Sequence, residues 1–247
     1  MNIKGCVAIV SGGNRGIGEA FVLELLEAGA KHVYVGSRDP QNAKALQEKE
    51  PERISVLSLD VADEKQIKAA AEQCSDVNLV VNNAGVFNKL SLMNAPDLSA
   101  MRNEMEVNYL GPVAMARAFA PIIEQNGGGC ILNVLSAGGI VSVPEMGGYS
   151  PSKFAARAAS NCLRAELAPR GIHVSSLIVG SVKTRMAEHV KGVAQVEPAV
   201  IAKAGILAAK AEIDEHDTDL HAIGVRAALA RDPAGLAKAL AAGVGAA

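Results

Sequence analysis

Short apolar runs alternate with longer segments of helical periodicity along most of this chain. The runs are rich in β-branched residues, which is typical of strands buried on both faces of a sheet. They are Val7–Val10, His32–Val35, Ile54–Leu59, Leu79–Val81, Cys130–Leu135 and Ile172–Val179. The helical segments between them are Ile17–Ala28, Asp39–Lys49, Glu64–Cys74, Leu98–Ile123 and Pro151–Ala168. This alternation predicts an α/β fold, a doubly wound parallel sheet of Rossmann-like type.

The last part of the chain departs from this pattern. From Pro198 it is rich in alanine and is expected to be helical, with a polar interruption at Glu212–Asp219. The tail Ala241–Ala247 is expected to fray. No linker, repeat or low-complexity segment divides the 247 residues. We therefore expect a single domain over residues 1–247, with an atypical C-terminal segment over about 198–247.

Composition narrows the class of protein. Apolar residues make up 49% and charged residues 20%, as in a packed globule, and the net charge of −2 gives no reason to expect nucleic acid or an anionic membrane as a partner. We see neither a secretory signal nor an apolar run long enough to span a membrane. The four cysteines and five histidines are scattered. We expect reduced thiols, no metal site and a cytoplasmic location.

Tyr149 and Lys153 lie four residues apart, with Ser136 thirteen residues upstream. On a helix, residues at this spacing share a face, so the ammonium of Lys153 can act on the phenol of Tyr149. A free phenol titrates at about pH 10, and a fixed positive charge beside it favours the phenolate and lowers its pKa. A hydroxyl such as that of Ser136 could steady a carbonyl oxygen. The trio predicts a device that moves one proton to or from a carbonyl or alcohol oxygen.

A glycine-rich segment, Ser11–Gly18, follows the first expected strand and opens the first expected helix. Glycine allows a tight turn and lets a pyrophosphate approach the backbone, and the helix N-terminus offers free N–H groups to the phosphates. Many glycine-rich segments are only turns, but this position in an α/β chain favours a dinucleotide. The expected cofactor-binding residues here are Gly12, Asn14, Arg15, Gly16, Ile17 and Gly18.

The end of the second strand should decide between the two nicotinamide cofactors. An acid there would bind the ribose hydroxyls of NAD(H), but Gly36 stands at that place and is followed by Ser37 and Arg38. A guanidinium pairs well with a phosphate, and Arg15 could add a second cation. We therefore expect Ser37 and Arg38 to bind NADP(H), with NAD(H) possible. The alternative is that Arg38 is solvated and Asp39 caps the next helix.

With these residues in view, the chain resembles the short-chain dehydrogenase/reductase family, in its compact single-domain branch. The resemblance covers about residues 3 to 186. The segments that carry it are Ser11–Gly18, Asp60-Val61, Asn82-Asn83-Ala84-Gly85, Asn108, Ser136 and Tyr149-x-x-x-Lys153.

The resemblance implies roles for individual residues. Gly12, Gly16, Ile17 and Gly18 would line the pyrophosphate, Asp60 and Val61 the adenine, and Asn82, Ala84 and Gly85 the nicotinamide-side ribose and the central strand. Val182 and Thr184 would contact the nicotinamide carboxamide and phosphate region. Asn108 would hold a water in a proton relay to Lys153. The catalytic residues would be Asn108, Ser136, Tyr149 and Lys153, and Lys153 would also hold the cofactor ribose with Tyr149 beside it.

Three positions depart from the family pattern. Ser11 stands where threonine is usual, and Val179-Gly180 where Pro-Gly is usual. Many relatives end in a last strand closed by an Asp-Gly-Gly segment that helps build a tetramer, and we find nothing that matches it. A homodimer through the helices containing Asn108 and Tyr149 is therefore expected more than a homotetramer.

The expected function is hydride transfer between NADP(H) and a ketone, an aldehyde or a secondary alcohol. Tyr149 would give or take the proton while Ser136 donates a hydrogen bond to the same oxygen. Apolar flanking residues favour a carbonyl reductase for apolar or aryl compounds; they are Phe87, Leu90, Val141, Val143, Met146 and Met186. Glu145, the one acid expected near the mouth, is either solvated or biases against anionic substrates.

Two other classes of function compete with this one. A non-catalytic nicotinamide-binding sensor or scaffold would not need the intact trio of Ser136, Tyr149 and Lys153. An epimerase or dehydratase with a tightly held nicotinamide usually has a larger substrate domain than this length permits. Loss of NADPH absorbance with a carbonyl compound distinguishes turnover from binding alone.

Overall fold

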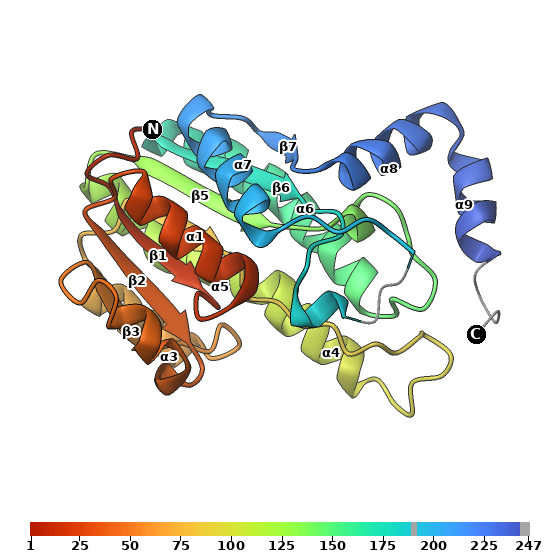
Figure 1. Ribbon diagram of the computed structural model, residues 1–247, viewed down its shortest axis with the longest axis horizontal. Helices are drawn as coiled ribbons and strands as arrows, with labels where there is room; N and C mark the ends of the chain where they lie inside the picture. The colour runs from red at the N-terminus through yellow and green to blue at the C-terminus, as the bar shows by residue number, and fades with distance from the viewer. Residues whose placement is uncertain (189–191, 243–247) are drawn as a thin grey trace.

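One parallel sheet runs through the protein. The computed structural model describes residues 1–188 and 192–242, and within these the strands lie in the order β3-β2-β1-β4-β5-β6-β7 (Figure 1). This order, with every pairing parallel, is the predicted doubly wound sheet. The strands are β1 Val7–Ser11, β2 His32–Ser37, β3 Ile54–Ser58, β4 Leu79–Asn82, β5 Gly129–Val134, β6 Ile172–Ile178 and β7 Glu215–Asp217.

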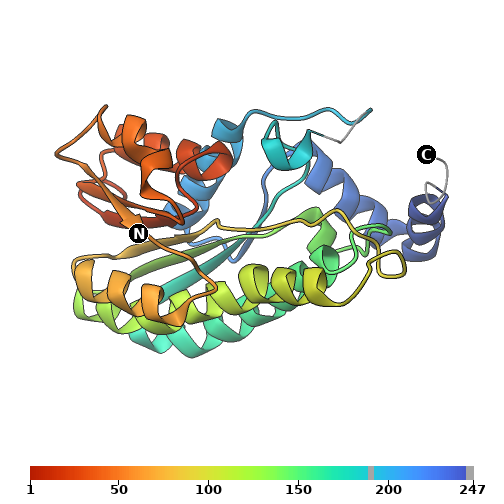
Figure 2. The same ribbon diagram turned by 90° about the horizontal axis from the view of Figure 1, so that it is seen from below.

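Helices cover both faces of the sheet (Figure 2). On one face α1 Gly16–Glu27, α2 Lys44–Gln47 and α7 Pro198–Ala211 bury apolar side chains; on the other lie α3 Glu64–Gln73, α5 Gly111–Gln125 and α6 Tyr149–Leu167. The remaining helices are α4 Ser99–Met105, α8 Leu220–Arg231 and α9 Pro233–Ala241. Short 3₁₀ turns are η1 Pro40–Ala43, η3 Ala137–Gly139, η4 Ala168–Arg170 and η5 Arg185–Ala187, and η2 Glu106–Leu110 is a π-helix.

Strand β1 illustrates why continuous apolar runs mark this sheet. Its side chains alternate between the two faces, so Ala8 and Val10 enter one core cluster while Val7 and Ile9 enter the other. Because both faces are covered, all of its residues are buried. The apolar run therefore has no polar alternation, as expected for a central parallel strand.

The helix expected over Asp39–Lys49 is shorter and broken. The side chain of Asp39 accepts a hydrogen bond from the backbone N–H of Gln41 at 3.1 Å, which starts the 3₁₀ turn η1 at Pro40. A separate helical turn, α2, follows and ends at Gln47. Asp39 thus caps a 3₁₀ turn and not a long helix, and this capping belongs to the alternative that the sequence analysis set against a phosphate site at Arg38.

The polar interruption at Glu212–Asp219 contains a strand that the sequence analysis missed. Glu215–Asp217 forms β7 and pairs in parallel with β6 at the edge of the sheet. Three polar residues carry no apolar pattern, and their pairing is supplied by β6 instead. The interpretation of Glu212–Asp219 as a polar interruption between helices therefore missed a last strand, and no Asp-Gly-Gly segment follows this strand.

The helix expected over Leu98–Ile123 is continuous but not uniform. It begins as α4, passes through the π-helix η2 and continues as α5 to Gln125. A π-helix inserts one extra residue into a turn and re-aims the side chains around it. This places Val107 and Asn108 in the interior while Glu106 stays exposed.

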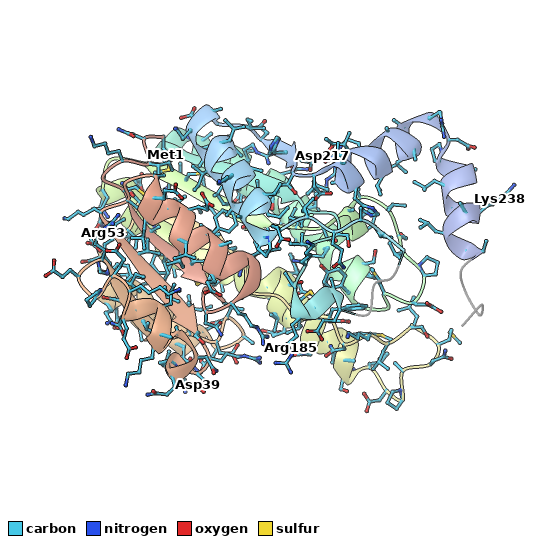
Figure 3. The ribbon with its side chains drawn as sticks, viewed as in Figure 1. Met1, Asp39, Arg53, Arg185, Asp217 and Lys238 are labelled. Carbon is cyan, nitrogen blue, oxygen red and sulfur yellow. The ribbon has the colours of Figure 1, made fainter. Side chains whose placement is uncertain are left out.

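The C-terminal helices extend from one end of the sheet (Figure 1). Helix α8 packs through Ala222, Val225 and Leu229 on a small cluster that includes Leu135 and Ile140. Helix α9 buries none of its residues. Figure 3 labels Asp217, at the junction of β7 and α8, and Lys238 on α9. The expected fraying of Ala241–Ala247 falls mostly on residues 243–247, outside the described part of the chain.

Candidate active site

The carboxyl ends of β1 and β4 define the candidate site. Strand order reverses between these neighbours, and in open α/β sheets ligands bind at such a switch point. The glycine-rich segment follows β1, and the Asn83–Gly85 segment follows β4. Both lie at the same edge because the two strands are parallel and in register.

The glycine-rich segment is a turn that only glycine fits. Gly12 and Gly16 have φ of +62° and +57°, a left-handed conformation that other residues rarely adopt. A Cβ at Gly18 would overlap the carbonyl oxygen of Gly12. Arg15, at the N-cap of α1, makes no side-chain capping bond, so the first N–H groups of α1 are left for a ligand.

Ser11 and Asn83 fasten this turn to β4. The Ser11 hydroxyl donates to the Val81 carbonyl and accepts from the N–H groups of Asn83 and Ala84, each at 3.1 Å. The Asn83 amide donates to the carbonyls of Ser11 and Gly12 at 3.0 and 3.1 Å. Ser11 thus supplies the hydroxyl group that threonine usually supplies at this position. The organising role of Asn83 was not assigned from sequence, because it depends on contacts across 71 and 72 residues.

The end of β2 carries an exposed cation. Arg38 and Arg15 are both exposed, and within the described ranges neither makes an ion pair. Ser37 is buried and donates to the Asp39 carbonyl at 2.8 Å. A Cβ at Gly36 would lie 2.5 Å from a methyl of Leu59, so an acid at this position has no room unless Leu59 moves.

The expected adenine and nicotinamide residues lie in different surroundings. Val61 is buried against Gly111, while Asp60 is half-buried and accepts from the Ala62 N–H. Val182 is buried and bridges Val196. Thr184 lies against the glycine-rich segment, because a Cβ at Gly16 would contact its methyl at 3.4 Å. The structure thus brings Thr184, which follows β6, to the glycine-rich segment that follows β1.

The catalytic trio converges. The Ser136 hydroxyl hydrogen-bonds the Tyr149 phenol, and Lys153 Nζ lies 5.8 Å from the centroid of the Tyr149 ring. Burial of its hydroxyl raises the pKa of Tyr149, the Ser136 hydrogen bond opposes this, and the nearby carboxylate of Glu104 adds to the rise. Burial lowers the pKa of Lys153 to about 8, and its ammonium donates to the Val134 carbonyl at 2.9 Å.

The lowered phenol pKa expected from Lys153 is not found in the protein alone. The Lys153 ammonium donates to the Val134 carbonyl, and burial of the phenol is the largest cause of the raised pKa of Tyr149. A protonated phenol at neutral pH is the form that can donate a proton. The arrangement therefore favours Tyr149 as an acid towards a bound oxygen.

Asn108 is buried beside Lys153 but does not contact it directly. Its amide oxygen accepts from the Val86 N–H and its amide nitrogen donates to the Val86 carbonyl, both at 2.9 Å. The same nitrogen donates to Ser152 at 3.0 Å. A Cβ on Gly85 would lie 3.2 Å from Asn108 Oδ1 and 3.8 Å from Lys153 Nζ. Asn108 and Lys153 thus flank Gly85, where a larger residue would crowd the Asn108 amide.

Asn82 lies inside the sheet. It is buried, and its amide donates to Asn133 on β5 at 2.8 Å, while its oxygen has no partner among the described residues. This placement agrees with support of the central strands. Ala84 and Gly85, further along the same segment, are half-buried at the edge of the site.

The structure places one of the expected apolar residues, Phe87, directly against Tyr149. The ring of Phe87 packs on that of Tyr149 with centroids 5.1 Å apart. Met146 approaches Gly138, and the backbone of Gly147 packs against that of Leu90. Val141 is buried, Val143 is half-buried, and Met186 is 39% exposed. Glu145 is exposed with φ of +70°.

Two buried carboxylates near the site were missed from sequence. Glu104 on α4 accepts backbone hydrogen bonds from Asn88 and Gly148, and Asp219 accepts from Gly180 N–H at 2.7 Å. The other oxygen of Asp219 caps α8 by accepting from His221 and Ala222. A helical acid normally predicts a solvated face. Glu104 had one detectable signal, its spacing of four residues from Asn108.

The residues fit a dinucleotide. The turn that needs glycine and the open helix N-terminus lie at the carboxyl end of β1, and Gly85, beside Asn108 and Lys153, follows the neighbouring strand β4. In the described part of the chain, no group of three or more His, Cys, Asp or Glu side chains could hold a metal ion. No helix among residues 1–188 and 192–242 is long and apolar enough to cross a membrane.

The comparisons with known proteins agree with this class of site. Residues 6–193 match the short chain dehydrogenase family model. The chain belongs to the short-chain dehydrogenase family, as the sequence motifs predicted.

Solved structures extend the likeness beyond the matched segment. The chain is similar to a short chain dehydrogenase from Burkholderia cenocepacia J2315 in complex with NADP, at 36% identity and a TM-score of 0.91 over 97% of this chain and 99% of that one. It is also similar to the NADPH-bound carbonyl reductase from chicken fatty liver, at 27% identity and a TM-score of 0.76 over 83% and 91% of the two chains.

Among curated relatives, a 3-alpha-(or 20-beta)-hydroxysteroid dehydrogenase of Mycobacterium bovis is 32% identical over 75% of this chain and 72% of its own. The Dehydrogenase/reductase SDR family member 7B of Mus musculus is also 32% identical, over 74% of this chain. The matching region covers 60% of that mouse relative's length.

Proposed function

We propose that the protein is an NADP(H)-dependent carbonyl reductase or alcohol dehydrogenase for apolar or aryl substrates. The observation that carries this proposal is the convergence of Ser136, Tyr149 and Lys153, with Lys153 beside Gly85 at the carboxyl end of β4. The bound nicotinamide supplies the hydride in reduction and accepts it in oxidation. The protein's part is to hold the carbonyl oxygen and to move one proton.

In reduction, Tyr149 donates its phenolic proton to the carbonyl oxygen as negative charge grows there. Ser136 donates a hydrogen bond to the same oxygen and thereby favours the developing charge. The Lys153 ammonium favours the phenolate that remains and donates to the cofactor ribose. Asn108 fixes the backbone at Val86 and holds the water through which Lys153 is reprotonated. Oxidation reverses each step, with Tyr149 as the base.

Cofactor choice is proposed from charge. Arg38 and Arg15 offer two exposed guanidinium groups at the adenosine end, and the packing of Gly36 on Leu59 disfavours an acid that would bind ribose hydroxyls. Gly12, Asn14, Gly16, Ile17 and Gly18 would cradle the pyrophosphate, Ser37, Asp60 and Val61 the adenosine, and Asn82, Ala84, Gly85, Val182 and Thr184 the nicotinamide half. NADP(H) is therefore favoured, while NAD(H) is the weaker ligand.

The remaining expectations are proposed on narrower support. One sheet with helices on both faces favours a single domain over residues 1–247. Cys6, Cys74, Cys130 and Cys162 are free thiols, which favours a cytoplasmic location. Exposed Leu98, at the N-cap of α4, and Leu110, in the π-helix that carries Asn108, favour a homo-oligomer, either a homodimer or a homotetramer.

The test is a panel of ketones, aldehydes and secondary alcohols, followed by absorbance at the NADPH band. We expect stoichiometric loss of NADPH with formation of an alcohol, fastest for apolar or aryl ketones. Cofactor binding without turnover on any member of a broad panel would instead favour a sensor or scaffold. NADH in place of NADPH tests the cofactor assignment in the same assay.

A further inference from the structure

A buried carboxylate, Glu104, lies between the two segments that flank Tyr149, and the mechanism above gives it no role. Its side chain is 2% exposed, and it forms no ion pair within the described part of the chain. Burying an acid without a cation is unfavourable unless hydrogen bonds satisfy it. Its partners are backbone N–H groups on two different loops.

The first partner belongs to the segment after β4, Gly85–Leu90, which we name the Phe87 loop. Asn88 N–H donates to Glu104 Oε1 at 2.7 Å, and two residues earlier Val86 exchanges two bonds with Asn108. Four residues along a helix and two along an extended chain both span about 6 Å. Glu104 and Asn108 therefore hold the Phe87 loop at two matched points.

The second partner is Gly148, the residue directly before Tyr149. Its N–H donates to Glu104, and a Cβ placed on it would lie 2.5 Å from Glu104 Oε2 and 2.7 Å from the Cα of Met101. Only glycine lets α4 approach the start of α6 this closely. Asn108 makes the parallel connection one turn further on, through Ser152 to the Tyr149 carbonyl at 2.7 Å.

We propose that Glu104 is a positioning residue that clamps the Phe87 loop to the first turn of α6 and so fixes the Tyr149 phenol against Phe87. This inference rests on the proposed function, since it gives Tyr149 the acid and base role. Glu104 acts through the backbone and touches neither substrate nor cofactor. Phe87, held between the two clamped residues, forms the substrate-facing wall beside the phenol.

The clamp also sets the charge around Tyr149. Lys153 faces it from its own helix and Glu104 from α4, while Lys89 and Glu145 on the flanking loops and Arg102 on α4 are exposed. Two N–H donors favour the ionised form of Glu104, against the burial that raises its pKa. The negative charge of Glu104 raises the pKa of Tyr149, so its removal should lower that pKa.

The experiment compares Glu104→Gln and Glu104→Asp with the wild-type enzyme. A glutamine at this position carries no charge, and it accepts a hydrogen bond from one N–H while its NH₂ faces the other. An aspartate keeps the negative charge, but its side chain is one methylene shorter. For Glu104→Gln we expect kcat/KM for alcohol oxidation to fall about 10- to 100-fold, with the rising limb of its pH profile moved to lower pH. For Glu104→Asp we expect a similar fall without that movement. NADPH affinity should stay unchanged in both.

The matched control is Glu72→Gln, which removes an acid that is 69% exposed on α3 and should leave kcat/KM and the pH profile unchanged. An unmoved pH midpoint in folded Glu104→Gln overturns the proposal, whatever happens to kcat/KM. If that variant does not fold, amide hydrogen exchange of the wild-type protein decides. Protection of the Asn88 and Gly148 amides supports the clamp, and exchange at unprotected rates overturns it. This measurement needs no turnover, so it separates failure of the clamp from failure of the proposed function.

Discussion

The two walls of the proposed site present different kinds of chemical group. The proposed cofactor wall, formed by Ser11–Gly18, Gly36–Arg38 and Asn83–Gly85, presents mainly backbone: left-handed glycines and an open helix N-terminus. The proposed catalytic wall presents side chains, namely Asn108, Ser136, Tyr149 and Lys153, carried by three separate parts of the chain, and Glu104 lies behind it as a positioning residue. The first wall depends on the shape of one turn, and the second on helices being held at the right distances. Damage to one should therefore leave the other largely intact.

The largest expected effect lies on the catalytic wall. Tyr149→Phe removes the proton donor while keeping the ring against Phe87, so turnover should fall about 1,000-fold. NADPH affinity, measured by fluorescence titration, should remain within about threefold of wild type because the cofactor wall is unchanged. Tyr34→Phe is the matched control, since Tyr34 lies on β2 and bonds Asp76. Unchanged turnover in Tyr149→Phe contradicts its acid and base role.

The converse change is Gly18→Ala on the cofactor wall. The added Cβ overlaps the Gly12 carbonyl, so the turn must open, and NADPH affinity should fall about 100-fold. Gly224→Ala on α8 is the control, because nothing lies within 4 Å of the added Cβ and helical alanine is favoured by up to about 1 kcal/mol. Isothermal titration calorimetry with NADPH compares the two. Equal affinity in both variants means that the turn does not cradle the cofactor.

A smaller change tests the one charged part of the cofactor wall. Arg38→Asp replaces an exposed guanidinium with an acid, so the ratio of kcat/KM for NADPH to that for NADH should fall about 10- to 100-fold. Lys238→Asp makes the same change of charge on α9, away from β2 (Figure 3). If both variants keep the wild-type ratio, Arg38 does not bind the 2′-phosphate.

Lys153 stands on the catalytic wall and is also proposed to hold the cofactor ribose. The titration of its ammonium should therefore change cofactor binding as well. Because its pKa is lowered to about 8, the ammonium is mostly charged at pH 7 and mostly neutral at pH 9. NADPH affinity should fall about tenfold across that range, since arginine and the 2′-phosphate do not change charge there. Binding titrations of wild type and Lys153→Met test this. Lys153→Met should bind NADPH weakly at every pH. If its NADPH affinity falls with pH as steeply as that of wild type, a group other than Lys153 causes the fall.

The contrast between the walls also explains what the sequence could predict. The parallel sheet and the glycine turn follow from local patterns. Buried strands appear in the sequence as continuous apolar runs, and a turn that needs left-handed residues appears as closely spaced glycines. The trio was predictable because Tyr149 and Lys153 share one helix. Strand β7 was not predictable, since Glu215–Asp217 is polar and its pairing comes from β6.

The positions of Glu104 and Asn83 depend on partners far along the chain. Asn83 bonds residues 71 and 72 positions away, and Glu104 reaches Asn88 and Gly148 from opposite directions in sequence. The raised pKa of Tyr149 has the same origin, because it follows from burial that no spacing reveals. The helix expected over Asp39–Lys49 was too long, because its polar sequence does not reveal that the 3₁₀ turn η1 separates Asp39 from the short α2.

The double duty of Asp219 limits how the end of this chain can change over generations. One oxygen starts α8 and the other holds Gly180, so the length of the link between β7 and α8 is set to the residue. An insertion or deletion there would move the carboxylate away from the strand end that leads to Val182 and Thr184. Helix α9, which buries nothing, can be shortened, lengthened or replaced at little harm. The terminal segment thus has two parts. The β7–α8 junction has a length that is fixed by geometry, whereas helix α9 can vary in length and sequence.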